Sequence, residues 1–183
     1  MATGDGALGF WKALSQEYAS TRHQRCWVHK TRNVLDKVPN SLQAHVKAAV
    51  QEIWRSPSRQ MALTAFETLS RMYGAKYPKA VDCVEEDLET LLTFDDFPAE
   101  HWQHIRTTNP IESTFATVRL RTAKTRGCGS RQTILAMVFK LGQSAEKGWR
   151  RLRGYRRLPE VMRGVKFIDG VAEEEINQGR KVA

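Results

Sequence analysis

Long hydrophobic segments are what this 183-residue sequence most clearly lacks. No stretch approaches the ~18 uncharged apolar residues that a membrane-spanning helix needs, so we expect no membrane partner. The first residues, Met1 to Asp5, have neither a basic flank nor an apolar segment after it, which argues against a signal peptide. These absences favour a cytosolic protein.

Cysteine is also scarce. Cys26, Cys83 and Cys128 are odd in number and widely spaced, which argues against a disulfide framework and is typical of a reducing compartment. Cys26 and His29 have the spacing of half a zinc site, but no second pair follows, so a structural zinc is the minor alternative. The sequence also lacks a Ser-His-Asp order, a phosphate-cradling glycine loop and a nucleotide-binding fingerprint.

Acidic residues are outnumbered by basic ones. The chain has 29 Lys and Arg against 20 Asp and Glu, a formal charge of +9 that favours a nucleic acid partner. Between positions 113 and 157, twelve basic residues face a single acid, Glu146. The alternative is a solvated basic face without a partner. The residues that we expect to bind DNA are Arg119, Arg121, Lys124, Arg126, Arg131, Lys140, Lys147 and Arg151.

The apolar pattern predicts a mainly helical chain. Apolar residues recur at helical spacing within residues 7–18, 40–54, 58–74, 78–92, 109–118 and 130–149. Residues 22–29 are the one convincing strand candidate, and a single strand is not stable without partners. In the last helix, Lys140, Lys147 and Arg151 share a face that could follow a phosphate backbone. From Glu173 onward we expect a solvated tail.

Two acidic residues allow a structural and a chemical interpretation. Glu112 falls in the first turn of the helix that Asn109 and Pro110 should start, where a carboxylate favours the helix dipole. Asp5, between two glycines, suits a helix cap. Either residue could instead ligate a metal, and the glycines beside Asp5 would let a phosphate approach. The residue pattern alone leaves both interpretations open.

Several motifs together resemble one known family. Gly4-Asp5-Gly6-Ala7-Leu8-Gly9, Arg25-Cys26-Trp27-Val28-His29-Lys30, Arg106-Thr107-Thr108-Asn109-Pro110-Ile111-Glu112-Ser113, Val118-Arg119-Leu120-Arg121-Thr122 and Gly127-Cys128-Gly129-Ser130 occur in this order. In this combination they resemble the Mutator-like transposases of bacterial insertion sequences, from about Gly4 to Gly170.

The resemblance implies a ribonuclease-H-like α/β core whose Asp-Asp-Glu triad holds Mg²⁺ or Mn²⁺. Such ions activate a water or a DNA 3′-hydroxyl and stabilise the leaving oxygen at phosphorus. Asp5 matches the second aspartate and Glu112 the glutamate. Cys26 and His29 match a Cys-x2-His signature, which we interpret as support for the active-site wall. The implied partners are double-stranded DNA, namely transposon ends and target, and another copy or a full-length transposase, in the bacterial cytoplasm at the nucleoid.

The sequence also departs from the family pattern. The first aspartate and most of the β-sheet have no counterpart, so we expect a mainly α chain: a C-terminal portion of the core with an all-helical insertion. The expected divisions are a core remnant (1–32), the helical insertion (33–104), the Glu112 helix and basic helix (105–157) and the tail (158–183). We predict a transposase fragment that is inactive alone. The alternatives are a non-catalytic basic DNA-binding or transposase-interacting module and a poorly folding relic.

Overall fold

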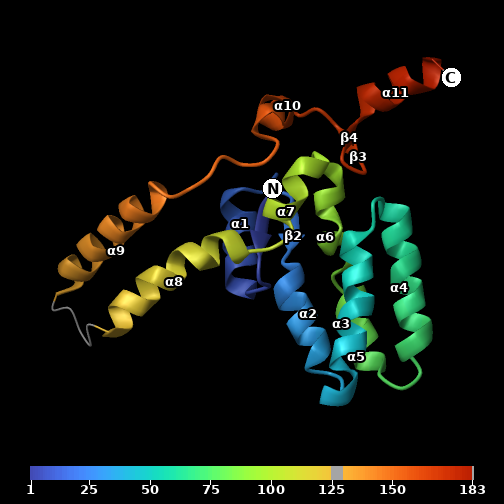
Figure 1. The fold of residues 1–183 in the computed structure, drawn as a ribbon, viewed down its shortest axis with the longest axis horizontal. Coiled ribbons are helices and arrows are strands. Elements are labelled where there is room, and N and C mark those ends of the chain that lie inside the picture. The colour runs from blue at the N-terminus through green and yellow to red at the C-terminus, as the bar shows by residue number, and fades with distance from the viewer. Residues whose placement is uncertain (125–129, 183) are drawn as a thin grey trace.

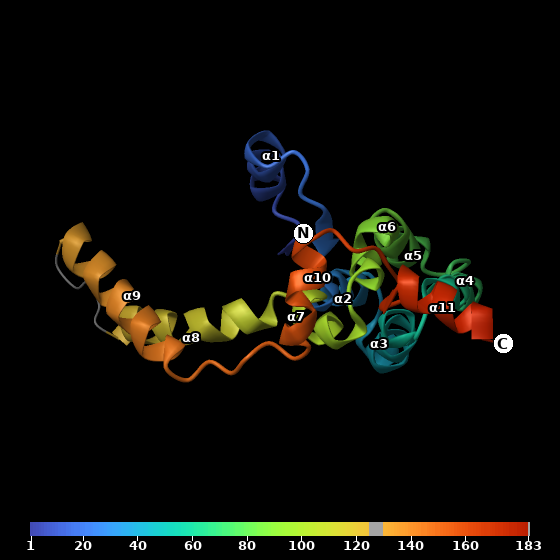
Figure 2. The ribbon, with the colours of Figure 1, turned by 90° about the horizontal axis from the view of Figure 1, so that it is seen from above.

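The structure is a computed structural model that describes residues 1–124 and 130–182. Helices dominate it, and the strands of the described residues form two separate two-stranded sheets. A helical body lies at one side of the molecule, a long arm of two helices extends from it, and a C-terminal segment crosses the body on the other side (Figures 1 and 2).

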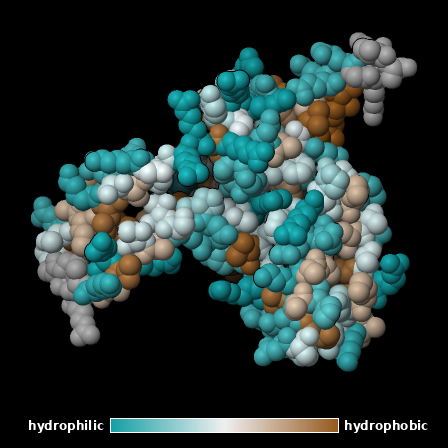
Figure 3. All heavy atoms as spheres, viewed as in Figure 1, coloured by the Kyte–Doolittle hydropathy of each residue, from teal (hydrophilic) through white to brown (hydrophobic). Residues whose placement is uncertain are grey.

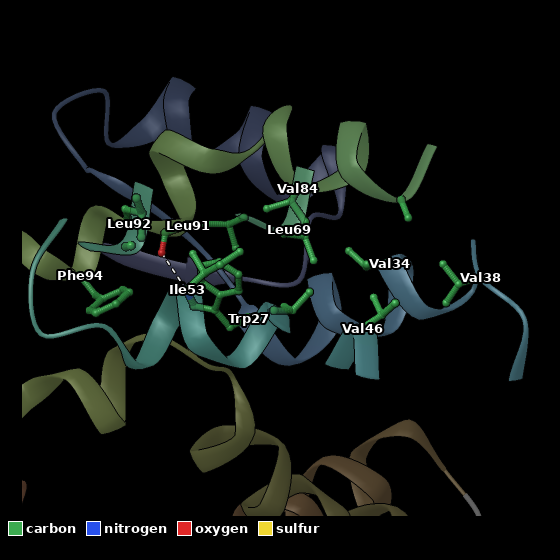
Figure 4. Packing of buried hydrophobic residues seen from close by; sticks show 13 residues of the cluster. Trp27, Val34, Val38, Val46, Ile53, Leu69, Val84, Leu91, Leu92 and Phe94 are labelled. Atoms are coloured by element: carbon green, nitrogen blue, oxygen red, sulfur yellow. Dashed lines mark hydrogen bonds between the residues drawn. The ribbon is translucent and has the colours of Figure 1, made fainter. Parts of the chain in front are cut away.

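The body consists of four helices that bury one apolar face each. They are α2 (Trp27–Leu35), α3 (Asn40–Arg55), α4 (Arg59–Tyr73) and α5 (Pro78–Glu85). Ser58 accepts a hydrogen bond from the Met61 amide and so caps α4, while Pro78 starts α5. The sequence predicted all of these starts except that of α2. The buried cluster between the helices includes Trp27, Val34, Val46, Ile53, Leu69, Val84, Leu91 and Phe94 (Figure 4).

The predicted strand at 22–29 is wrong in its length and in its isolation. Strand β2 covers only His23–Arg25, and it pairs in parallel with β1 (Ala2–Gly4), whose three residues are too few for a periodic signal. Helix α1 (Leu8–Glu17) connects the two strands. The chain turns into α2 at Trp27 because this indole is buried and donates to the carbonyl of Leu91 at 2.8 Å (Figure 4).

Short helical turns connect the body to the arm. They are α6 (Leu88–Leu91), η1 (Thr93–Asp96), η2 (Ala99–His101) and α7 (Trp102–Ile105). The predicted helix from Pro78 to Leu92 is therefore interrupted after Glu85. Trp102 packs edge-to-face on Phe94, with ring centroids 5.2 Å apart, and its indole donates to the Phe97 carbonyl at 2.8 Å. Trp102 therefore packs against the buried cluster of the body.

The arm is formed by α8 (Asn109–Lys124) and α9 (Arg131–Glu146). Ser130 caps α9 as predicted, by accepting from the Thr133 amide at 3.3 Å. The helix ends at Glu146, earlier than expected, because the Gly148 amide turns back to the Ala145 carbonyl. Val118 is the buried residue of α8, and α9 has none. Brown hydrophobic atoms are accordingly visible on the arm in Figure 3.

The C-terminal segment folds onto the body before Glu173, and the predicted tail after it is mostly exposed where its burial is described, but forms a helix. It contains η3 (Tyr155–Arg157), α10 (Leu158–Met162), the hairpin β3 (Phe167–Ile168) and β4 (Val171–Ala172), and α11 (Glu173–Val182). Phe167 is buried at the hairpin, and the Gly170 amide donates to the Asp95 carbonyl at 2.9 Å. Gly170 has a φ of +81°, and a Cβ there would overlap Ala99. This close contact was not visible in the apolar pattern.

Candidate active site

The ends of the two parallel strands define the candidate site. Parallel strands place their carboxyl ends at the same edge of a sheet, and Gly4 is in register with Arg25. Asp5 and Cys26 therefore leave neighbouring strands side by side, and the Cys26 amide donates to the Gly4 carbonyl at 2.8 Å. In open α/β sheets this edge is where ligands bind.

The segment before α8 is tied to the same edge. The Thr3 hydroxyl donates to the Ile105 carbonyl at 2.6 Å, and the Trp27 amide donates to the Arg106 carbonyl at 3.1 Å. Helix α8 consequently begins beside the start of α2, although about eighty residues separate the two in the sequence (Figure 1).

Thr108 orients the carboxylate of Glu112. Helix α8 begins at Asn109, so Thr108, and not Asn109 as predicted, is the residue that precedes the helix. Its carbonyl accepts from the Glu112 amide at 3.1 Å, and its hydroxyl donates to Glu112 Oε1. His29 Nε2 lies 3.7 Å from the same oxygen, a contact that becomes an ion pair when the imidazole is protonated. The Glu112 side chain is 42% exposed, so it remains accessible to a ligand.

Cys26 and His29 contact each other and Thr108. Cys26 is fully buried, and its Sγ lies 3.3 Å from His29 Nδ1 and 3.3 Å from the Thr108 amide, which donates to it. Burial alone would raise the pKa of the Cys26 thiol, but hydrogen bonds from Thr108 and His29 outweigh burial and lower the pKa. The Cys-x2-His pair is therefore a hydrogen-bonded unit that reaches Glu112 on one side and Thr108 on the other.

Asp5 has a different local role. Its Oδ1 accepts from the Ala7 amide at 3.0 Å in the turn before α1, and no hydrogen bond or ion pair of the described residues joins it to Glu112. Gly6 has a φ of +99°, and a Cβ there would overlap the guanidinium of Arg25. The space beside this glycine, which we expected to admit a phosphate, is thus occupied by Arg25.

The donor set is too small for a metal centre of this chain alone. Among residues 1–124 and 130–182, no three Asp, Glu, His or Cys side chains lie close enough together to hold an ion. Glu112 supplies a single carboxylate here, and its nearest polar partners are a hydroxyl and an imidazole. These residues do not fit a complete Mg²⁺ or Mn²⁺ site, which needs several oxygen ligands.

One charged group of this region was missed by sequence reasoning. Asp87 accepts from Arg25 Nε at 3.0 Å and lies 2.5 Å from Lys30 Nζ, and both basic side chains are about nine-tenths buried or more. Lys30 also donates to the Cys83 carbonyl at 2.6 Å. Burial would raise the pKa of Asp87, but Lys30 and Arg25 lower it. The only feature of the sequence that could have indicated this ion pair is Lys30, a lysine on the buried face of α2.

The basic residues that we expect to bind DNA lie on and after the arm. Arg119, Arg121 and Lys124 are exposed on α8, and Arg131 and Lys140 are exposed on α9. Lys147 follows α9, and Arg151 lies beyond the helix with its guanidinium 5.2 Å from the Tyr155 ring centre. The three-residue face predicted for one helix is therefore interrupted before Arg151. Arg126 lies outside the described residues.

The described helices are each too short or too polar to cross a lipid bilayer.

The sequence profile of the family described as "Transposase, Mutator family" matches residues 1–152. The chain is 54% identical to the transposase for insertion sequence element IST2 of Acidithiobacillus ferrooxidans, over 93% of this chain and 58% of that protein. It is 48% identical to the transposase for insertion sequence element IS6120 of Mycolicibacterium smegmatis, over 93% of this chain and 53% of that protein. The chain thus spans about half the length of these curated relatives.

Proposed function

This chain belongs to the Mutator family of transposases, and we propose that it forms the Glu112-bearing and DNA-binding part of an enzyme that cuts and joins DNA strands to move an insertion sequence. The observation that carries the proposal is the contact network of Cys26, His29 and Thr108, which holds the Glu112 carboxylate at the edge where the two parallel strands end. A carboxylate that is oriented from two sides and still half-exposed suits a ligand site better than a helix cap.

We propose that activity requires further polypeptide. Asp5 and Glu112 would contribute two carboxylates to a ribonuclease-H-like site, and a third acidic group would come from a segment that the relatives have in addition. Carboxylates suit this purpose because they are hard anionic ligands for Mg²⁺ or Mn²⁺. The short parallel sheet supports the proposal because its edge is the position in which a larger sheet would gather such residues.

A second candidate is a basic DNA-binding module without catalytic activity, which could also pair with a full-length transposase. The exposed cations of the arm favour it, because they need no metal to bind phosphates. It predicts that Lys140→Gln, Lys147→Gln and Arg151→Gln together weaken binding of duplex DNA and reduce the slope of log affinity against log salt by about 2 to 3. Glu112→Gln should leave this binding unchanged.

The experiment that separates the two candidates measures duplex binding and metal binding in parallel. Fluorescence anisotropy with a labelled duplex compares the Lys140, Lys147 and Arg151 triple variant with a control that removes three exposed lysines, Lys37→Gln, Lys76→Gln and Lys79→Gln. Calorimetric titration with Mn²⁺ is done on the chain alone and on the chain mixed with the remaining part of a full-length relative. Metal binding that appears only in the mixture and is lost in Glu112→Gln supports the enzyme; its absence in the mixture contradicts it and leaves the binding module.

A further inference from the structure

A cleft of about 690 Å³ lies between α2, α3 and the segment that leads into α8. Its walls combine basic groups, amide side chains and one half-buried indole: Arg32, Lys47, Arg106, Gln51, Asn109 and Trp54. Sites of this volume hold small molecules the size of a nucleotide. The residues that line this cleft are not part of the contact network around Glu112, so that network does not account for the basic and amide side chains in the cleft.

None of the cleft's three cations forms an ion pair with a described acid, although Asp95 acts on Arg106 at longer range. Elsewhere in the described residues, Arg22, Arg25, Lys30 and Arg59 each form an ion pair with an aspartate or glutamate. Within the described residues, Arg32, Lys47 and Arg106 form none. The single acid on the cleft wall, Asp36, makes no ion pair with them either. Arg32 and Lys47, two cations at one hollow that also contains Arg106, favour an anionic ligand such as a phosphate.

In this cleft the Arg106 guanidinium lies over the Trp54 ring, and we call this stacked pair the Trp54–Arg106 surface. The Arg106 guanidinium lies 4.4 Å from the centre of the Trp54 ring, and its Nη1 donates to the Trp54 carbonyl at 2.9 Å. Arg55 approaches the same ring at 5.3 Å. Aromatic rings and guanidinium planes are the groups on which unstacked bases rest, and this stacking accepts any base.

Amide side chains are available beside this surface. In the part of the chain that the structure describes, the side chains of Gln51 and Asn109 make no hydrogen bond, although both line the cleft. Asn and Gln side chains offer a donor and an acceptor together, which is the combination that base edges pair with. The basic side chains could thus bind a phosphate, the Trp54–Arg106 pair could stack on a base, and the amide side chains could pair with its edge.

The lining of the cleft includes chain neighbours of the residues that contact Glu112. Thr107 and Asn109 line it, and they flank Thr108, whose hydroxyl donates to Glu112. Val28, which also lines the cleft, precedes His29, the other neighbour of Glu112. We propose that this cleft binds one unpaired nucleotide of the DNA strand that is processed at Glu112, with its phosphate at Arg32 and Lys47 and its base on the Trp54–Arg106 surface. The inference rests on the proposed function.

The test uses the full chain and two DNA probes of the same length, a labelled single-stranded oligothymidylate and a labelled duplex. Removal of the two exposed cations in Arg32→Gln/Lys47→Gln should weaken single-strand binding about tenfold at low salt, with a change of less than about twofold for the duplex, which the arm binds. The control Lys37→Gln/Lys79→Gln removes the same charge from the second hollow, on the other side of α2, and should change neither affinity.

A second readout tests stacking without relying on charge. A single-stranded probe with one 2-aminopurine should lose fluorescence on binding, and Trp54→Leu should abolish most of this quenching while circular dichroism shows that the variant remains folded. If the cleft variants bind the single strand as well as the unchanged chain, the proposal is wrong although duplex binding persists. If neither probe binds to the unchanged chain, the proposed DNA-binding function fails as well.

Discussion

At the scale of single residues, Thr108 determines the geometry of the candidate site. Its amide donates to the Cys26 sulfur, its hydroxyl donates to Glu112, and its carbonyl accepts from the first turn of α8. Every one of these partners belongs to a motif that resembles the family pattern, but Thr108 itself gave no chemical signal in the sequence. A hydroxyl before a helix start is too common to indicate a particular function.

The first prediction concerns this hydroxyl. Thr108→Val retains the shape of the side chain and removes its hydrogen bonds, so the free energy of unfolding should fall by about 1–2 kcal/mol, measured by urea denaturation. Thr108→Ser retains the hydroxyl and should lose less than half of that amount. A negligible loss in Thr108→Val beside a larger loss in Thr108→Ser would show that packing of the methyl group matters and that the hydrogen bonds do not.

At the scale of elements, Asp87 joins the small sheet to the helical body. It pairs with Arg25 at the end of β2 and with Lys30 inside α2, so the two elements on either side of Cys26 depend on one carboxylate. The Gln24 side chain, which donates to the Leu91 carbonyl at 3.0 Å, ties β2 to α6 in the same region. The position of the site therefore depends on the body, and not on the two short strands alone.

The second prediction tests this connection. Asp87→Asn leaves two buried cations without a counter-charge, and the free energy of unfolding should fall by about 2–4 kcal/mol, reduced from the value for a fully buried pair because Asp87 keeps a third of its surface exposed. Asp82→Asn, on the exposed side of α5, removes the same charge and should change stability by less than about 0.5 kcal/mol. Similar losses in both variants would contradict a specific role for Asp87.

At the scale of the whole molecule, a buried carboxyl lies where the C-terminal hairpin meets the body. Asp95 is 2% exposed, and its Oδ2 has no hydrogen-bond partner. The hairpin approaches it through Gly170 and through Asp169, which accepts from the Arg59 amide at 2.7 Å. Burial raises the pKa of Asp95 to about 7; Arg59 opposes the shift, and Asp169 adds to it.

The third prediction is a pH dependence of global stability. A raised pKa means that the folded state binds the Asp95 proton more tightly than the unfolded state, so stability should fall as the pH rises from about 4 to about 7, by roughly 1.4 kcal/mol per unit of pKa difference. The lowered pKa of Asp87 acts in a different window, because its contribution is lost only below the ordinary value of 3.8.

Thermal unfolding between pH 4 and pH 8 measures this dependence. Asp95→Asn should remove most of the slope between pH 4.5 and pH 7, because the side chain no longer titrates. Asp96→Asn, at the half-exposed neighbour that pairs with Arg22, is the control and should retain the slope. A slope that persists unchanged in Asp95→Asn would assign the dependence to other groups.

The overall arrangement places the proposed DNA contacts and the candidate site on one connected element. Helix α8 begins at Asn109, directly after Thr108, carries Glu112 in its first turn, and forms the first half of the arm with its exposed cations (Figures 1 and 2). The nucleotide cleft opens at the same helix start. A DNA strand that binds along the arm would thus lead toward the Glu112 carboxylate, because α8 connects the two.

The sequence by itself determined the elements whose signals are local. The starts of α3, α4, α5 and α9 follow from caps, a first-turn proline and helical spacing, and the basic C-terminal third follows from composition. Glu112, Cys26 and His29 were identified together because their motifs resemble one family, and the structure brings these three side chains into contact. Their catalytic and supporting roles stay predictions.

Only the tertiary structure decided the remaining features. The early end of β2, its pairing with β1, the hairpin on Asp95 and the role of Thr108 all depend on contacts between segments far apart in the chain, such as the 82 positions between Cys26 and Thr108. Such contacts outweigh the local preferences of short segments, because a three-residue strand gains stability only from its neighbours. The role of Asp5 is likewise not determined by its local sequence, because a metal site would need further ligands that lie elsewhere in the folded protein.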